Sequence, residues 1–149
     1  MNLAYEGLTK RFKYKINFIE TKEENNIEFN DLRLSFKKTT HSQDNLAIKI
    51  INNKVSMVYS GDGAPRKIDD FYKDLDLLIQ ETYFYDQEKI SHASIVNAIK
   101  FSEENNIKCL TLTHINRDFR KNDLLKMRDK IKSDKVKIII PEPFDEYNL

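Results

Sequence analysis

The sequence is poor in the residues that mark low-complexity, disulfide-bonded or membrane-spanning chains. Its 149 residues include three glycines, three prolines, three histidines and one cysteine. So little glycine and proline excludes a linker-like composition, and the lone Cys109 excludes an internal disulfide and suits a reducing cytoplasm. Apolar runs of only a few residues predict no transmembrane helix, and the first residues, Met1–Glu6, lack the pattern of a secretory signal. We therefore expect a cytoplasmic protein with no membrane partner.

An excess of charge of one sign is also lacking. The chain has 25 lysines and arginines against 24 aspartates and glutamates, a formal net charge of +1. This balance provides no overall basic surface, so charge alone does not favour nucleic acid as a partner. The length suits one domain with a real core, and no repeat or composition break divides it. We expect a single domain over residues 1–149.

Alternating apolar and polar residues in the first half are typical of half-buried β-strands. Asn52-Asn53 separates two such strands and predicts a tight hairpin, because asparagine tolerates a positive φ. The first half is therefore an antiparallel meander. Its strands are expected over residues 12–18, 32–36, 46–50 and 55–59.

After Gly61 the pattern changes to helices that alternate with short, dense apolar strands. Such an order predicts β-α-β units with right-handed crossovers and a second, largely parallel sheet. The fold class is therefore α/β. Helices are expected from Pro65 to Tyr72, from a Ser91 N-cap to Phe101 and over residues 123–132, and strands over residues 75–79, 109–112 and 136–140.

All three histidines and one aspartate lie at the predicted element boundaries. Asp62 follows a strand and has a glycine on each side, which allows a ligand close to the carboxylate, although a plain turn is the alternative. His114 ends another strand, where α/β sheets bind ligands, with a purely structural role as the alternative. His41 lies between two strands. His92 begins a helix, where a neutral imidazole is favoured.

These residues occur in an order that resembles the C-terminal half of the metallo-β-lactamase fold, in particular its ribonuclease Z and phosphodiesterase-like branch. The resemblance covers roughly residues 12 to 140 and implies half of an αββα sandwich. The motifs that carry it are His41 before the strand 45–50, Ser60-Gly61-Asp62-Gly63, Gln80-Glu81-Thr82-Tyr83-Phe84, Ser91-His92-Ala93-Ser94 and Leu112-Thr113-His114.

The resemblance implies a centre with two divalent metals, zinc in the first place and manganese in the second. His41 would bind one metal, His114 the other, and Asp62 would bridge them. Glu81 and His92 would form a pair that orients and protonates the leaving oxygen. Two metals would activate a bridging water and neutralise charge on a phosphodiester.

The sequence also departs from the family. The family's main ligand cluster, His-x-His-x-Asp-His, precedes the position of His41, but no histidine occurs before His41 here. Each metal would then have at most two protein ligands, fewer than the three that catalytic zinc normally has. Gln80 replaces a family histidine and Gly63 a threonine. We expect weak metal binding and an isolated chain that is inactive.

The resemblance to the ribonuclease Z branch also implies a class of substrate and a kind of partner. About 20 residues separate His41 from Asp62, too few for the arm with which bacterial ribonuclease Z grips transfer RNA. A small phosphodiester or ester is therefore the expected substrate. The alternative is a non-catalytic module that uses an uncovered sheet face to bind the absent N-terminal half or a second copy of the chain. Tyr83-Phe84-Tyr85 would stack bases or pack internally, and Cys109 would be a core residue or a nucleophile.

Overall fold

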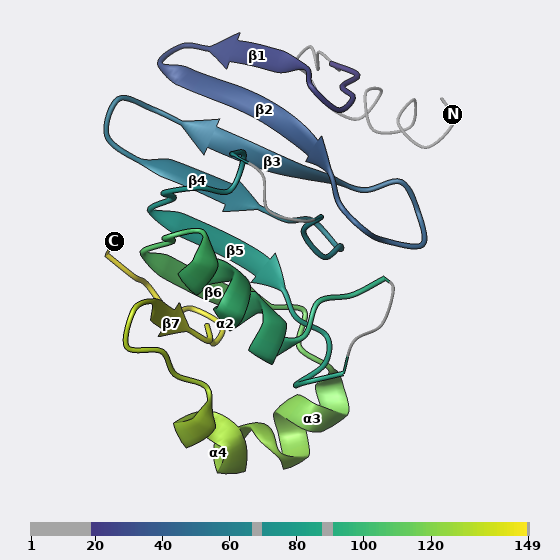
Figure 1. Ribbon diagram of the computed structural model, residues 1–149, viewed down its shortest axis with the longest axis vertical. Coiled ribbons are helices and arrows are strands. Elements are labelled where there is room, and N and C mark those ends of the chain that lie inside the picture. Colours follow the sequence, from purple (N-terminus) through teal and green to yellow (C-terminus); the bar gives the residue numbers. More distant parts are fainter. Residues whose placement is uncertain (1–18, 67–69, 88–90, 149) are drawn as a thin grey trace.

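The structure, a computed structural model, describes residues 19–66, 70–87 and 91–148. Its described strands form one mixed sheet in which the spatial order follows the sequence order from β1 to β7 (Figure 1). The strand predicted over residues 12–18 lies outside the described residues. The strands are β1 (Asn26–Phe29), β2 (Leu32–Lys38), β3 (Leu46–Ile51), β4 (Ser56–Tyr59), β5 (Leu77–Glu81), β6 (Cys109–Thr113) and β7 (Lys137–Ile139).

The N-terminal part of the sheet is the predicted antiparallel meander. β2, β3 and β4 pair in register, with Phe36 opposite Ile48 and Ile48 opposite Tyr59. The hairpin between β3 and β4 forms at Asn52, but not through a positive φ. Instead the Asn52 side-chain oxygen accepts the backbone N–H groups of Lys54 and Val55 within the turn, at 2.9 and 2.8 Å.

The C-terminal part of the sheet is parallel, as predicted, but it is not a second sheet. β4 is antiparallel to β3 and parallel to β5, so its two edges join both parts into one sheet. β5, β6 and β7 continue with parallel pairing. The predicted α/β class, with antiparallel strands followed by β-α-β units, is confirmed.

The helices differ from the prediction in their boundaries. α2 begins after Ser94, whose side chain accepts the N–H of Asn97, and not after Ser91. The helix predicted over residues 123–132 is divided into two short pieces, a four-residue α-helix and a three-residue 3-10 turn. The prediction of a helix from Pro65 to Tyr72 was wrong for the described residues: 70–74 form turns, and 67–69 lie outside the described residues. No described helix is long and apolar enough to cross a membrane. The helices are α2 (Ile95–Glu104), α3 (Arg117–Asn122), α4 (Leu124–Met127) and the 3-10 turn η1 (Arg128–Lys130).

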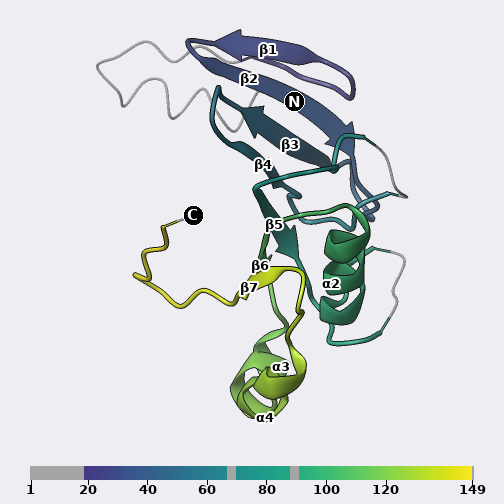
Figure 2. The same cartoon turned by 60° about the vertical axis from the view of Figure 1, so that its left-hand side comes forward.

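The two faces of the sheet have different surroundings. α2 packs over one face, where Leu78, Leu110 and Ile95 are fully buried in the main core (Figure 2). On the opposite face the described core cluster contains strand residues only. We call this the open face, and the strand register assigns to it Phe29, Leu34, Phe36, Ile48, Ile50, Met57, Tyr59, Leu77, Ile79, Cys109 and Ile139.

Candidate metal centre

Three of the candidate residues lie where neighbouring strands end. Asp62 follows β4, Glu81 ends β5, and His114 follows β6. Because β4, β5 and β6 are parallel, their carboxyl ends meet at the same edge of the sheet, which is the usual ligand edge of such sheets. His92 reaches this edge from the segment that precedes α2.

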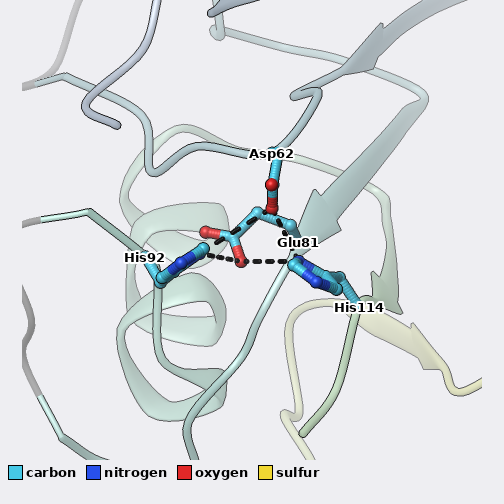
Figure 3. Close-up of side chains that lie close together, drawn as sticks. All are labelled: Asp62, Glu81, His92 and His114. Carbon is cyan, nitrogen blue, oxygen red and sulfur yellow. Dashed lines mark hydrogen bonds and ion pairs between the residues drawn. The ribbon is translucent and has the colours of Figure 1, made fainter. Parts of the chain in front are cut away.

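Four side chains bring one ligand atom each to this edge, within 4.8 Å of one another. Figure 3 shows them pointing toward a common centre. His114 Nδ1 lies 2.7 Å from Asp62 Oδ1 and 3.7 Å from Glu81 Oε2. His92 Nδ1 lies 3.3 Å from Glu81 Oε2 and 3.8 Å from Asp62 Oδ1. Ligands of a tetrahedral zinc are roughly 3.4 Å apart, given bonds of about 2.1 Å. The donor set and its spacing therefore fit a divalent metal.

Glu81 is a buried carboxylate, and burial explains its partners. Its side chain is only 1% exposed, and an unpaired charge there would be strongly destabilising. One carboxylate oxygen accepts the N–H of Ala93 at 2.6 Å, which leaves Oε2 to face His92 and His114. The predicted Glu81–His92 pair is thus formed, and its role as an acid–base pair stays a prediction.

His114 has a left-handed backbone conformation, which is uncommon for residues other than glycine. Its φ is 53°, in the left-handed region, where a residue with a side chain is destabilised by about 1 kcal/mol. Such conformations concentrate at functional sites, because they direct a side chain where regular structure cannot. Here the turn after β6 brings the imidazole against Asp62.

His41 contacts Asp62 on the side of its carboxylate that faces away from His114. Its Nε2 lies 3.5 Å from Asp62 Oδ2, the oxygen that does not face His114, and its Nδ1 accepts the N–H of Gln43. With Nδ1 as an acceptor, the neutral ring carries its proton on Nε2. The structure therefore brings His41, Asp62 and His114 into one site, but His41 is not among the four converging ligands. Its role as a ligand stays a prediction.

Aromatic residues surround the histidines. The Tyr83 ring packs against both His92 and His114, with centroids 5.2 and 5.5 Å away. A pocket of about 360 Å³ next to the cluster is lined by Tyr59, Gly61, Asp62, Thr113 and His114. A second pocket of about 360 Å³ is lined by Tyr83, Phe84, Tyr85, Asp86, Gln87, Asn116 and Phe119, so part of the aromatic run faces open space.

Cys109 and Gln80, which the sequence also singled out, are both buried and have structural contacts. Cys109 is buried in β6 among apolar side chains, and this burial raises the pKa of its thiol, so the core alternative is the one the structure favours. Gln80, which replaces a family histidine, is fully buried and donates its amide to the carbonyl of Gly63 at 3.0 Å. It therefore braces the loop that carries Asp62.

Sequence reasoning missed Asn45, whose side chain contacts the backbone on both sides of Gly61. No local pattern could have indicated this role, because both contacts are with main-chain atoms 15 and 17 residues away.

The chain is similar in sequence to known proteins and similar in fold to solved structures. No protein-family model matches the chain. Ribonuclease Z from Methanocaldococcus jannaschii is 35% identical over an alignment of 106 residues that covers 62% of this chain and 33% of that protein. Ribonuclease Z from Sulfurisphaera tokodaii is 31% identical over 102 residues, 66% of this chain and 34% of that protein. The chain thus spans about a third of the length of the curated relatives it matches.

Among solved structures, the metallo-β-lactamase fold protein YhfI from Bacillus subtilis superimposes with a TM-score of 0.70 at 23% identity, over 91% of this chain and 59% of that one. This chain has part of the metallo-β-lactamase fold and is related to ribonuclease Z. The fold and the resemblance predicted from the ordered motifs are confirmed. Within the metallo-β-lactamase fold, the cluster around Asp62 is a candidate metal centre.

Proposed function

We propose that this chain is part of a metal-dependent hydrolase that cleaves a small phosphodiester or ester, and that it provides ligands of the metal. The observation that carries the proposal is the convergence of Asp62, Glu81, His92 and His114 at the carboxyl edge of parallel strands. The carboxylates of Asp62 and Glu81 and the imidazole of His114 suit zinc in the first place and manganese in the second.

Asp62, His114 and Glu81 are the proposed ligands of one ion. Three protein ligands are the usual number for catalytic zinc, and they leave a position for water. The sequence analysis implied at most two protein ligands for each metal, and this proposal gives one ion three. When bound, the ion would lower the pKa of its water and neutralise negative charge on the substrate.

His92 is then the group that handles the proton of the leaving oxygen. Its Nδ1 faces the buried Glu81 carboxylate at 3.3 Å, which fixes the ring and leaves Nε2 as its remaining polar atom. Tyr83 packs on the same ring with a small interplanar angle of 30° and limits its rotation. A histidine held in this way orients its free nitrogen without binding the ion itself.

We further propose that the open face packs against the remaining half of the metallo-β-lactamase fold. Tyr59 and Phe29 on this face are 46% and 63% exposed, and large exposed apolar side chains on one face indicate a partner surface. The partner would also border the site, because Tyr59 lines the pocket next to Asp62. A purely non-catalytic interaction role is the second candidate, and the same open face favours it.

Coordination chemistry separates the two candidates. The chain loaded with cobalt(II) in place of zinc is titrated with bis(p-nitrophenyl) phosphate while the visible spectrum is recorded. A hydrolytic centre keeps an open position, so the spectrum should change saturably and the change should disappear in His114→Ala. A bound ion whose spectrum does not respond to the phosphodiester would indicate a closed, structural site and would contradict the hydrolase proposal.

A further inference from the structure

The side chain of Asn45, which lies just before β3, contacts the centre of the loop that carries Asp62. Asn45 Oδ1 accepts the backbone N–H of Asp62 at 3.1 Å, and Asn45 Nδ2 donates to the carbonyl of Ser60 at 2.9 Å. The same Nδ2 also donates to Thr39 Oγ1. One amide thus bridges the backbone on both sides of Gly61.

The orientation of this amide follows from its partners. A backbone N–H only donates and a carbonyl only accepts, so Oδ1 must face Asp62 and Nδ2 must face Ser60. The contact is also close, since a Cβ atom on Gly61 would lie 2.5 Å from Asn45 Oδ1. Only glycine permits this approach, and Gly61 also has a φ of 68°.

Other contacts hold the loop beyond Asp62. Gln80 donates to the carbonyl of Gly63, and Thr40 forms a two-way backbone bridge with Ala64 at 2.8 and 3.1 Å. Neither reaches Asp62 itself, whose carboxylate is half exposed and contacts only histidines among the described ion pairs. Ser60 Oγ donates to the carbonyl of Gly61 at 3.1 Å, but among the described residues Asn45 is the side chain that accepts the Asp62 N–H.

We propose that Asn45 is a positioning residue that fixes Asp62 in its ligating geometry and so sets the metal affinity of the site. The effect on metal affinity rests on the proposed function, whereas the positioning of Asp62 does not. The physical reason is that a ligand held before the ion arrives does not need to be ordered on binding, and partners that orient ligands typically contribute about 10- to 100-fold in metal affinity.

The test compares Asn45→Ala with Asn52→Ala as a matched control. Both asparagines flank β3 and both accept backbone N–H groups, but Asn52 lies at the opposite end of the strand from the site. The zinc dissociation constant is measured by competition with a chelator. It should rise about 10-fold or more in Asn45→Ala and stay unchanged in Asn52→Ala. Equal constants in the wild type and Asn45→Ala, or equal losses in both variants, would overturn the proposal.

A second readout requires no metal. In the apo protein, the Asp62 amide should exchange its hydrogen about fivefold faster in Asn45→Ala, as expected for one lost hydrogen bond, and at the wild-type rate in Asn52→Ala. An unchanged Asp62 exchange rate would overturn the positioning role. If the wild type bound no metal but this selective change was seen, the proposed function would fail and the positioning of Asp62 would stand.

Thr39→Val provides the same comparison if Asn45→Ala does not fold. Valine has the shape of threonine, and this variant retains Asn45 itself. It removes only the Thr39 hydroxyl, which accepts a hydrogen bond from Asn45 Nδ2. Exchange at Asp62 should then be faster than in the wild type. No change in either exchange or zinc affinity would count against the proposal.

Discussion

Replacement of Gly61 by alanine tests whether the Asp62 loop is built around the Asn45 amide. Two separate effects should destabilise the variant. The φ of 68° places alanine in the left-handed region, a loss of about 1 kcal/mol. The new methyl group would also lie 2.5 Å from Asn45 Oδ1 and 2.9 Å from Nδ2, and such overpacking costs about 2 kcal/mol. The expected total loss in the free energy of unfolding is about 3 kcal/mol.

A double-mutant cycle separates the two effects. In an Asn45→Ala background the methyl group finds space, so Gly61→Ala should cost only about 1 kcal/mol there, which gives a coupling of about 2 kcal/mol. The assay is urea unfolding of the four proteins, with Asn52→Ala as a background in which the full loss should remain. If the two substitutions were additive, Asn45 would not be the group that Gly61 accommodates, and the account of this loop would be refuted.

The remaining predictions concern the rest of the fold. The hydrogen bond from Lys108 holds the pKa of Asp76 at about 2, against a usual 3.8. Asp76→Asn should therefore lower the free energy of unfolding by about 1 kcal/mol near neutral pH, since Lys108 is largely exposed. Urea unfolding should show this difference vanish as the pH falls from about 4 to about 2, because a lowered carboxyl pKa stabilises the fold only while the carboxylate is ionised. Ser94→Ala removes the N-cap of α2 and should lower the free energy of unfolding by about 1 kcal/mol, as measured by thermal unfolding. Cys109 should resist a thiol reagent in the folded protein and react after denaturation, as measured by thiol titration, because burial raises its pKa.

The strands that the sequence predicted well are those with a clear apolar alternation or a dense apolar run. β2, β3 and β6 fall within one or two residues of their expected positions. β1 was missed because it is short and largely exposed, and it depends on its pairing with β2 rather than on its own pattern. The single helix expected over residues 123–132 is divided into α4 and η1, although Leu124 and Ile131 are both buried and lie seven residues apart, as on one face of a helix.

The sequence indicated the residues that converge at this edge but not their geometry, and their roles stay predictions. The position of Asp62, Glu81 and His114 after parallel strands follows from topology, so their convergence could be expected from the order of the motifs. The left-handed turn at His114 and the amide of Asn45 depend on contacts between distant parts of the chain, and no local pattern encodes them. The same holds for the joining of the two strand groups into one sheet through β4.

The central claim is that this chain itself provides a metal centre, and zinc titration of matched variants tests it most directly. The wild type should bind about one equivalent of zinc, as a site with three protein ligands predicts. His114→Ala should weaken binding more than 100-fold because a direct ligand is lost, whereas His92→Ala should weaken it by about 10- to 100-fold because that ring orients the ligand Glu81 and does not bind the ion. A wild type without saturable zinc binding, or an affinity that His114→Ala leaves unchanged, would contradict the account.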